Sequence, residues 1–443
     1  MNPRPEGSLE QTVPEKDFLA ILQDPCAAFF RLAGTLTSRD SKAALGHWSK
    51  RVFFVLHSEA DELESFLDDY GARYNRGFVY LTELVASTRG FALAGLSMEH
   101  FLRRFEGYGV LEALPEDDRG LARADLDRAG RFICQSLQGL LSEARREGLE
   151  LGLAIPADHY PRSAFEEAAV RFRLPRDVGA ERIEDEEQRI AEVATKYLQA
   201  CTMLEEAHLE SSDSEEDRKQ RLTRSCTEEL ARVYEATVHN LQSTYDTYIK
   251  NTDLEEHDPR LARLRGHVSA TLHLLEVVTQ LIHFVERHES DVRDDLAHRR
   301  LESIVHRDAV NEVTLNVLLH WALRFMLMGR EIAEELLPTY TNVQALEVEL
   351  PEGLVLHARP ASLVVSIVNR YGTPVEMEID GQVCNAGSIL ELMVVVGSNP
   401  ESRRFVFRGD AHPLGDIALL FQHGLGEEGL SALPDELDYL RGA

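Results

Sequence analysis

The spacing of prolines constrains the fold of this chain more than any other feature. Between residues 176 and 337 of the 443-residue sequence, Pro259 is the only proline. Proline removes a hydrogen bond and creates a clash inside a helix, so two proline-free spans of about 80 residues each favour long helices. We therefore predict a long-helix bundle over residues 176–342.

A seven-residue repeat of apolar side chains follows Pro259. Its two seam positions hold Leu261, Val268, Leu275 and Ile282, and Leu264, Thr271, Val278 and Val285. A seam of this length must pack against another helix of the same chain or against a second subunit. The segment before Pro259 has apolar residues at helical spacing, namely Leu222, Cys226, Leu230, Val233, Leu241 and Tyr248. We favour an antiparallel hairpin within one chain, and a homodimer is the alternative.

The first half of the chain is also predicted to be helical. The clearest segments are 51–66, 78–93 and 121–146, within a helical region over residues 15–175. A further helical region, residues 301–337, is apolar on most faces, which indicates central burial. Residues 1–14 contain three prolines and are predicted to be a disordered tail.

The pattern changes after Tyr340. Residues 344–350 alternate between polar and apolar, and so do residues 374–380, which end in an Asp380-Gly381 hairpin turn. The whole order is strand 344–350, helix 358–370, strand 374–380, strand 382–384, helix 388–396, strand 403–408 and helix 413–423. This βαββαβα order predicts an α+β open-faced sandwich over residues 343–430, with a tail over 431–443. The expected fold class is thus multidomain: a large all-α region followed by a small α+β domain.

Charge and composition exclude several functions. The chain has 76 acidic residues against 47 Lys and Arg, a formal net charge of −29. A negative charge of this size repels nucleic acids and anionic membranes, so we expect neither as a partner. The most apolar stretch, residues 313–328, is interrupted by Asn316, His320 and Arg324 and predicts a buried helix rather than a membrane span.

Cysteine usage and the N-terminus indicate the compartment. The five cysteines form no CxxC pair, and residues 1–8 lack an apolar signal core. We therefore expect reduced thiols in a cytoplasmic protein. The sequence has neither a Walker A motif nor a glycine-rich dinucleotide fingerprint, so no cofactor is expected.

One motif indicates a chemical function. His357-Ala358-Arg359-Pro360-Ala361 lies at the start of the first predicted helix of this domain, after the first predicted strand. The first N–H groups of a helix lack partners within it, and together with the helix dipole they form an anion site. A histidine here places a ring nitrogen beside that site, and Arg359 supplies donors that suit a phosphoryl group. The inferred chemistry is attack of neutral imidazole on a phosphoryl group and its onward transfer. A surface histidine that only caps a helix is the alternative.

These residues resemble the HPr phosphocarrier family of the bacterial phosphotransferase system. The resemblance covers residues 344–429 and includes a second motif, residues 385–393, followed by Gly397. It implies that His357 is phosphorylated, that Arg359 binds the phosphoryl group, and that the donor is an enzyme I-type protein. The chain would then be a phosphoryl carrier rather than a free-standing catalyst.

The second motif implies regulation. By the same resemblance Ser388 is the site of an HPr-type serine kinase, at the start of the second helix. A phosphate there gains from the helix dipole and adds charge to a docking face, formed by Ile389, Leu390 and Met393. A plain helix cap is the alternative reading of Ser388.

The sequence departs from the family at three positions. Val355 stands where the family usually has glycine, Gly387 where it often has lysine, and Glu391 where it often has a small residue. Val355 and Glu391 favour a second hypothesis, a regulatory or scaffold protein that uses the HPr-like domain only for interaction. Under the first hypothesis the helical region binds a partner, dimerises or gates access to His357, and under the second it is a scaffold. A third hypothesis, a helical metalloenzyme, depends on the Glu205-x-x-His208 spacing alone, and we expect no metal because an exposed ion pair explains that spacing better.

Overall fold

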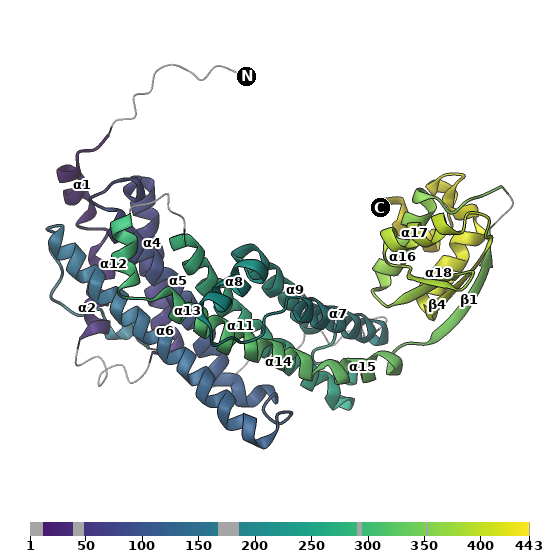
Figure 1. The fold of residues 1–443 in the computed structure, drawn as a ribbon, viewed down its shortest axis with the longest axis horizontal. Coiled ribbons are helices and arrows are strands. Elements are labelled where there is room, and N and C mark those ends of the chain that lie inside the picture. The colour runs from purple at the N-terminus through teal and green to yellow at the C-terminus, as the bar shows by residue number, and fades with distance from the viewer. Residues whose placement is uncertain (1–11, 39–47, 167–185, 290–294, 351–352, 443) are drawn as a thin grey trace, which may run out of the picture. The chain divides into compact units, whose positions relative to one another are not determined.

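The computed structural model describes residues 12–38, 48–166, 186–289, 295–350 and 353–442 (Figure 1). The predicted disordered tail therefore lies outside the described residues, except for 12–14. The chain divides into two compact units: residues 1–174, 207–236 and 269–325 form the first, and residues 175–206, 237–268 and 326–443 form the second. The predicted boundaries after residues 175 and 342 stay predictions.

The first unit is a bundle of long helices. Helices α4 (Lys50–Asp69), α5 (Val79–Arg104) and α6 (Glu116–Glu150) correspond to the three segments predicted from periodicity. Helix α5 packs against both α4 and α6 and is buried on most sides. Gly95 permits its close approach to α4, because a Cβ atom at this position would lie only 2.2 Å from Cε1 of Phe53.

Shorter elements complete the first unit. They are α1 (Glu15–Leu22), α2 (Ala27–Thr37), α8 (Glu215–Ser225), α12 (Asp295–Glu302), α13 (Arg307–Val313), a π-helical turn η4 (Thr314–Leu319) and the 3-10 turns η1 (Ala72–Tyr74), η2 (Phe105–Tyr108) and η3 (Arg162–Phe165). Helix α14 (His320–Met328) follows the π-helical turn directly. Its Trp321 and Phe325 are fully buried, which confirms the predicted central burial of this segment.

The predicted hairpin around Pro259 is confirmed. Helix α9 (Glu228–Tyr248) is followed by the short α10 (Asp253–His257) and by α11 (Pro259–Glu289), in which proline occupies the first helical position. Nδ1 of His283, late in α11, lies 2.8 Å from Oε2 of Glu228 at the start of α9. Nε of Arg265, early in α11, donates to Oδ1 of Asp246, late in α9, over 2.6 Å. The two helices are thus antiparallel, and all eight seam residues are buried.

Two details of the predicted helices are wrong. Leu222 and Cys226 do not belong to the same helix as Leu241, because α8 ends at Ser225 and Thr227 starts α9 by accepting a hydrogen bond from the Leu230 N–H at 3.3 Å. Val233 lies away from the seam and is 47% exposed. The region 301–337 is helical over most of its length, as predicted, and is divided into several helices: it breaks after α12, and again at Gly329 before α15 (Arg330–Thr339).

The second unit contains α7 (Glu186–Glu206), α15 and the C-terminal α+β domain. The domain has the predicted element order: β1 (Val343–Glu349), α16 (Ala358–Tyr371), β2 (Val375–Ile379), β3 (Gln382–Asn385), α17 (Ile389–Ser398), β4 (Arg404–Asp410) and α18 (Ala411–Gln422). The strands form one antiparallel sheet in the order β1-β4-β2-β3. Asp380 and Gly381 both have positive φ, as the predicted tight turn requires.

The core of this domain explains why the sheet is open on one side. Val375, Met377 and Ile379 of β2 are buried with Phe405 and Phe407 of β4, whereas the residues between them face outward. Helices α16, α17 and α18 also contribute side chains to this core, so they cover one face of the sheet. After α18 the chain continues through three 3-10 turns: η5 (Gly424–Gly426), η6 (Leu430–Ala432) and η7 (Asp435–Gly442). Three buried leucines from this segment belong to the same core: Leu433, between η6 and η7, and Leu437 and Leu440 in η7.

One described helix is long and apolar enough to cross a bilayer. Its span is residues 259–287 in α11, and 78% of the most apolar window of this span is buried in the structure. Burial of this extent is typical of the core helix of a soluble protein. The interrupted stretch 313–328 does not pass the same test.

Candidate functional site

His357 stands at the N-cap of α16, directly before the helix begins. Its backbone is extended, and its ring Nδ1 accepts a hydrogen bond from the backbone N–H of Arg359 at 3.4 Å. The preceding turn is tight, since the His357 N–H donates to the Val355 carbonyl oxygen at 2.9 Å. The side chain remains 52% exposed. The sequence therefore folds so that Nδ1 faces the positive end of a helix and is open to a reaction partner.

The other ring nitrogen of His357 faces a carboxylate that sequence reasoning missed. Nε2 lies 3.2 Å from Oε1 of Glu427, an oxygen that is itself buried. The hydrogen bond from the Arg359 N–H makes Nδ1 an acceptor, and the negative charge of Glu427 attracts the ring proton to Nε2, so the Nε2–H tautomer is favoured. That tautomer leaves the lone pair on Nδ1, the atom at the helix start.

The turn η5 positions Glu427. Gly424, Leu425 and Gly426 all have positive φ, a conformation that two glycines make accessible. Leu425 adopts it as well and is fully buried in the domain core, which anchors the turn. The Gly-Leu-Gly pattern before two glutamates was the available signal for this turn, but nothing in the pattern indicates which histidine Glu427 meets.

The first turn of α16 offers donors for an anion. The N–H groups of Ala358 and Arg359 lie in this turn, of which the Arg359 N–H donates to Nδ1 of His357, whereas Pro360 has no N–H to leave without a partner. The Ala361 N–H already donates to the His357 carbonyl oxygen at 3.0 Å. The Arg359 side chain is exposed, and its guanidinium forms no ion pair within the part of the chain that the structure describes. It is thus available to an incoming phosphoryl group.

Ser388 occupies the matching position on α17. Its side-chain oxygen accepts from the Glu391 N–H at 3.4 Å, so it is an N-cap. Three neighbouring side chains predicted as a docking face lie at or near the surface: Leu390 is 73% exposed, Ile389 is 42% exposed, and Met393 is half-buried. Val394, 58% exposed, extends this face by one turn.

Two departures from the family pattern now have a structural description. The Val355 side chain is 58% exposed, so it points away from the core while its carbonyl oxygen closes the turn to His357. The Glu391 carboxylate turns back to the strand end, where its Oε2 accepts from the Asn385 N–H at 3.1 Å. Its charge is thus partly engaged by the backbone rather than fully presented to the docking face.

The remaining candidates form no site. Helix α7 ends at Glu206, so Glu205 is helical and His208 is not; Glu205 pairs with Arg330, with Oε1 3.0 Å from Nη1, and His208 lies 3.7 Å from Glu210. The expected ion pair between Glu205 and His208 is therefore wrong. Among the described residues no group of three metal-ligating side chains gathers. All five cysteines are free, and burial raises the thiol pKa of Cys226 to about 12.

Comparison with known proteins assigns a family to the C-terminal region alone. The family described as the PTS HPr component phosphorylation site matches residues 344–399, which include His357 and Ser388. Searches of curated proteins and of solved structures found no match. The C-terminal region is therefore HPr-like, a similarity that suggests a phosphocarrier-type function and partners of the phosphotransferase system, and the N-terminal helical region has no family match.

Proposed function

We propose that the C-terminal domain accepts a phosphoryl group on Nδ1 of His357 from an enzyme I-type donor and passes it to a downstream acceptor. The observation that carries this proposal is the placement of the two ring nitrogens. Nδ1 lies at the start of α16, and Nε2 lies 3.2 Å from the Glu427 carboxylate. A helix cap alone would need no carboxylate at the far nitrogen.

The transfer step follows from this arrangement. The Nδ1 lone pair gives up its hydrogen bond from the Arg359 N–H and attacks phosphorus, a nitrogen–phosphorus bond forms, and the donor's bond to phosphorus breaks with its electron pair leaving on the donor. The imidazole ring gains positive charge in this step, and Glu427 stabilises that charge through Nε2–H. The N–H groups of Ala358 and Arg359, together with the Arg359 guanidinium, balance the charge of the phosphoryl oxygens.

A second candidate function is a regulatory module that docks without relaying phosphate. The charge of the domain favours it: residues 344–443 hold 15 Asp and Glu against 6 Arg and no Lys, a net charge of −9. An acidic surface of this kind repels any donor surface of the same charge. We place the protein in the cytoplasm, without nucleic acid or membrane as partner, and the helical region then binds a partner, dimerises or regulates the domain.

Phosphorylation with phosphoenolpyruvate and the organism's own enzyme I distinguishes the two functions. The wild-type protein should gain an acid-labile, base-stable phosphate that His357→Ala lacks. Arg359→Ala should slow labelling while the domain melts as in the wild type, because an exposed charge contributes little to stability. A wild-type chain that stays unlabelled yet binds phosphotransferase-system proteins would establish the docking function instead.

A further inference from the structure

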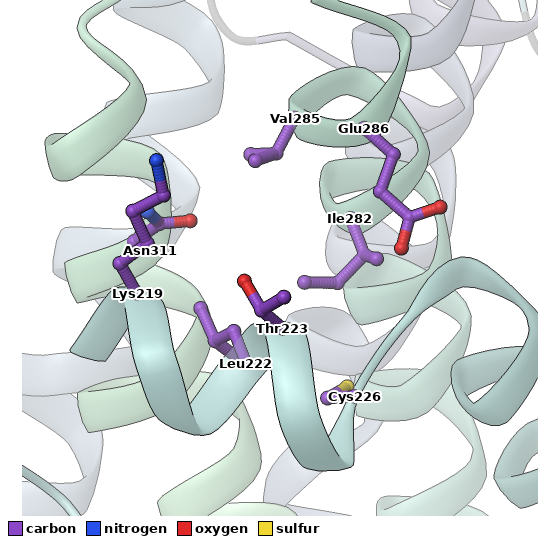
Figure 2. A pocket seen from close by; sticks show the side chains of 8 residues that line it. All are labelled: Lys219, Leu222, Thr223, Cys226, Ile282, Val285, Glu286 and Asn311. Atoms are coloured by element: carbon purple, nitrogen blue, oxygen red, sulfur yellow. The ribbon is translucent and has the colours of Figure 1, made fainter. Parts of the chain in front are cut away.

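A cavity in the first unit and the outer edge of the sheet in the second unit both lie outside the phosphocarrier chemistry. The cavity has a volume of about 350 Å³ and lies between α8, α11 and α13 (Figure 2). Its polar groups are engaged or closed off: Oε1 of Glu286 accepts from the Glu228 N–H at 2.8 Å. Lys219 has a partner within the protein, and Oδ1 of Asn311 is closed to solvent. The sheet edge, in contrast, presents backbone groups that a partner can bind.

Strand β1 forms this edge, and its hydrogen bonds determine which backbone groups are free. The Leu350 N–H donates to the Arg403 carbonyl oxygen at 2.8 Å, and the Ala411 N–H donates to the Asn342 carbonyl oxygen at 3.0 Å. Hydrogen-bonded pairs occur at every second residue of an antiparallel ladder, so the even-numbered residues of β1 direct their N–H and C=O groups to β4. The same groups of the odd-numbered residues point away from the sheet, and within the described residues none of them has a hydrogen-bond partner. These residues are Val343, Ala345, Glu347 and Glu349.

The β1 edge lacks most of the devices that protect an edge strand from a further strand. Such devices are proline, lysine, a β-bulge or a very short strand. Strand β1 has seven residues without proline or lysine, and its register with β4 is continuous from Val343 to Glu349. The opposite edge differs, because β3 has only four residues and its Asn385 N–H donates to Oε2 of Glu391 at 3.1 Å. A long open edge of the β1 kind can pair with an extended segment of another protein.

The apolar side chains of β1 set one half of the partner's chemistry. Leu346 and Val348 lie opposite Phe407 and Phe405 of the domain core and are half-buried against it. Neighbouring residues of an added antiparallel strand would project on this same face of the sheet. Apolar side chains there would cover the parts of Leu346 and Val348 that remain exposed.

The acidic side chains of β1 set the other half. Glu347 pairs with Arg404 of β4, whereas the exposed Glu349 forms no ion pair among the residues that the structure describes. Both glutamates lie on the face of the sheet that the helices leave uncovered, and the domain as a whole has a net charge of −9. A second copy of this chain would bring the same negative charge to the edge. Charge complementarity therefore favours a basic segment.

We infer that the β1 edge binds an extended segment of a partner protein, antiparallel to β1, in which basic and apolar side chains alternate. Backbone pairing with the odd-numbered residues of β1 supplies affinity. A basic residue opposite Glu349 and apolar residues opposite Leu346 and Val348 supply specificity. This inference does not depend on phosphoryl transfer to His357.

Hydrogen exchange of the full chain, followed residue by residue by NMR, tests the inference. The probe is the peptide Ac-Arg-Val-Arg-Val-Thr-Ser-Thr-NH₂, whose first residue lies opposite Glu349 in the proposed register. Saturating peptide should slow exchange of the Ala345 and Glu347 amides about tenfold or more, because these N–H groups gain partners. The amides of Leu346 and Val348, which already bond to β4, should change little.

Two results would overturn the inference. One is the absence of protection at the Ala345 and Glu347 amides with peptide at about 1 mM, a concentration that detects even weak binding. The other is protection of these amides without peptide that grows with protein concentration, since it would assign the β1 edge to a second copy.

Two N-methylated forms of the peptide separate backbone pairing from charge attraction. Methyl groups on the third and fifth residues remove N–H donors that face β1, so binding should be lost. Methyl groups on the second and fourth residues replace N–H groups that point away from β1, so binding should persist. Equal affinities of the two methylated peptides would contradict strand pairing.

Two matched variants test the charge at the edge. Glu349→Gln should weaken binding of the unmethylated peptide about threefold, as expected for an exposed ion pair. Glu376→Gln removes the same charge from the same face of the sheet, but on β2, and should bind like the wild type. Equal affinities of the two variants would contradict a basic residue opposite Glu349.

Discussion

The C-terminal domain and the first helical unit place their charged residues differently. In the domain the described charges lie at or near the surface, apart from Asp410, which is 3% exposed and accepts from the Asn342 N–H at 2.8 Å. The first unit buries Glu64, Glu83, Glu147 and Arg218 inside its helix packing. The domain can therefore use its exposed charges for partners, whereas the helical unit depends on its buried charges for stability.

The largest expected effect lies in the helical unit. Leu275 is fully buried in the α11 seam, so Leu275→Asp places an unpaired charge in the core and should cost about 4 kcal/mol or more. Circular dichroism with limited proteolysis should show the helical unit unfolding before the C-terminal domain. A variant that melts like the wild type would show that the α11 seam is not the core of this unit.

A buried ion-pair cluster gives the next effect. Arg287 lies 3.2 Å from Oε1 of Glu64 and 3.3 Å from Oε2 of Glu83, which is fully buried. Arg287→Met removes this arginine from the buried Glu83 and one of two arginines from Glu64, which keeps Arg89, and should destabilise the unit by about 3 kcal/mol. The control is Arg128→Met, which breaks an exposed pair with Glu312 and should cost less than about 1 kcal/mol. If urea denaturation shows that both variants lose the same free energy of unfolding, the claim that buried ion pairs matter more than exposed ones is contradicted.

The same cluster predicts a pH dependence. Burial alone would raise the pKa of Glu64, but the hydrogen bond from Arg89 and the charge of Arg287 hold its pKa below the usual value. A carboxyl whose folded pKa is lowered stabilises the fold above its unfolded pKa of about 4.3 and loses that contribution as the pH falls through the folded pKa. Unfolding of Glu64→Gln should therefore depend less on pH below about 4.3 than unfolding of the wild type. Identical pH profiles would contradict this account of Glu64.

In the C-terminal domain the expected effects are on function. Glu427→Gln keeps the side-chain shape but removes the charge that favours the Nε2–H tautomer of His357, so phosphoryl transfer should slow about tenfold, or about 1.4 kcal/mol. Glu428→Gln, next to it and exposed, should transfer at the wild-type rate. Equal phosphoryl-transfer rates for Glu427→Gln and Glu428→Gln would show that Glu427 has no part in the transfer.

The smallest effect separates capping from regulation at Ser388. Ser388→Ala removes the cap of α17 and should cost about 1 kcal/mol without slowing transfer. Ser388→Asp keeps a capping side chain and adds charge beside Ile389 and Leu390, so it should preserve stability but weaken donor docking. Measuring transfer kinetics and thermal melts of Ser388→Ala and Ser388→Asp checks both predictions. If Ser388→Asp binds the donor as well as the wild type does, Ser388 serves only as the helix cap of α17.

The contrast between the two regions also shows what the sequence could predict. In the C-terminal domain short-range signals suffice: period-two alternation, the Asp380-Gly381 turn and the His357 helix start each act within a few residues. In the helical unit the seam of α11 was predictable, but the break between α8 and α9 was not, because Thr227 interrupts an apolar spacing that continues across it. Contacts that join distant segments, such as Glu427 with His357 or Arg287 with Glu83, have no local signature.

The central claim is that Nδ1 of His357 is the phosphorylated atom. It is tested most directly by phosphorylating the ¹⁵N-histidine-labelled protein with phosphoenolpyruvate and enzyme I, then recording phosphorus–nitrogen couplings by NMR. The account predicts one phosphohistidine, with phosphorus coupled to Nδ1 of His357 and no signal in His357→Ala. Phosphorus on Nε2 of His357, or a phosphohistidine that persists in His357→Ala, would contradict it.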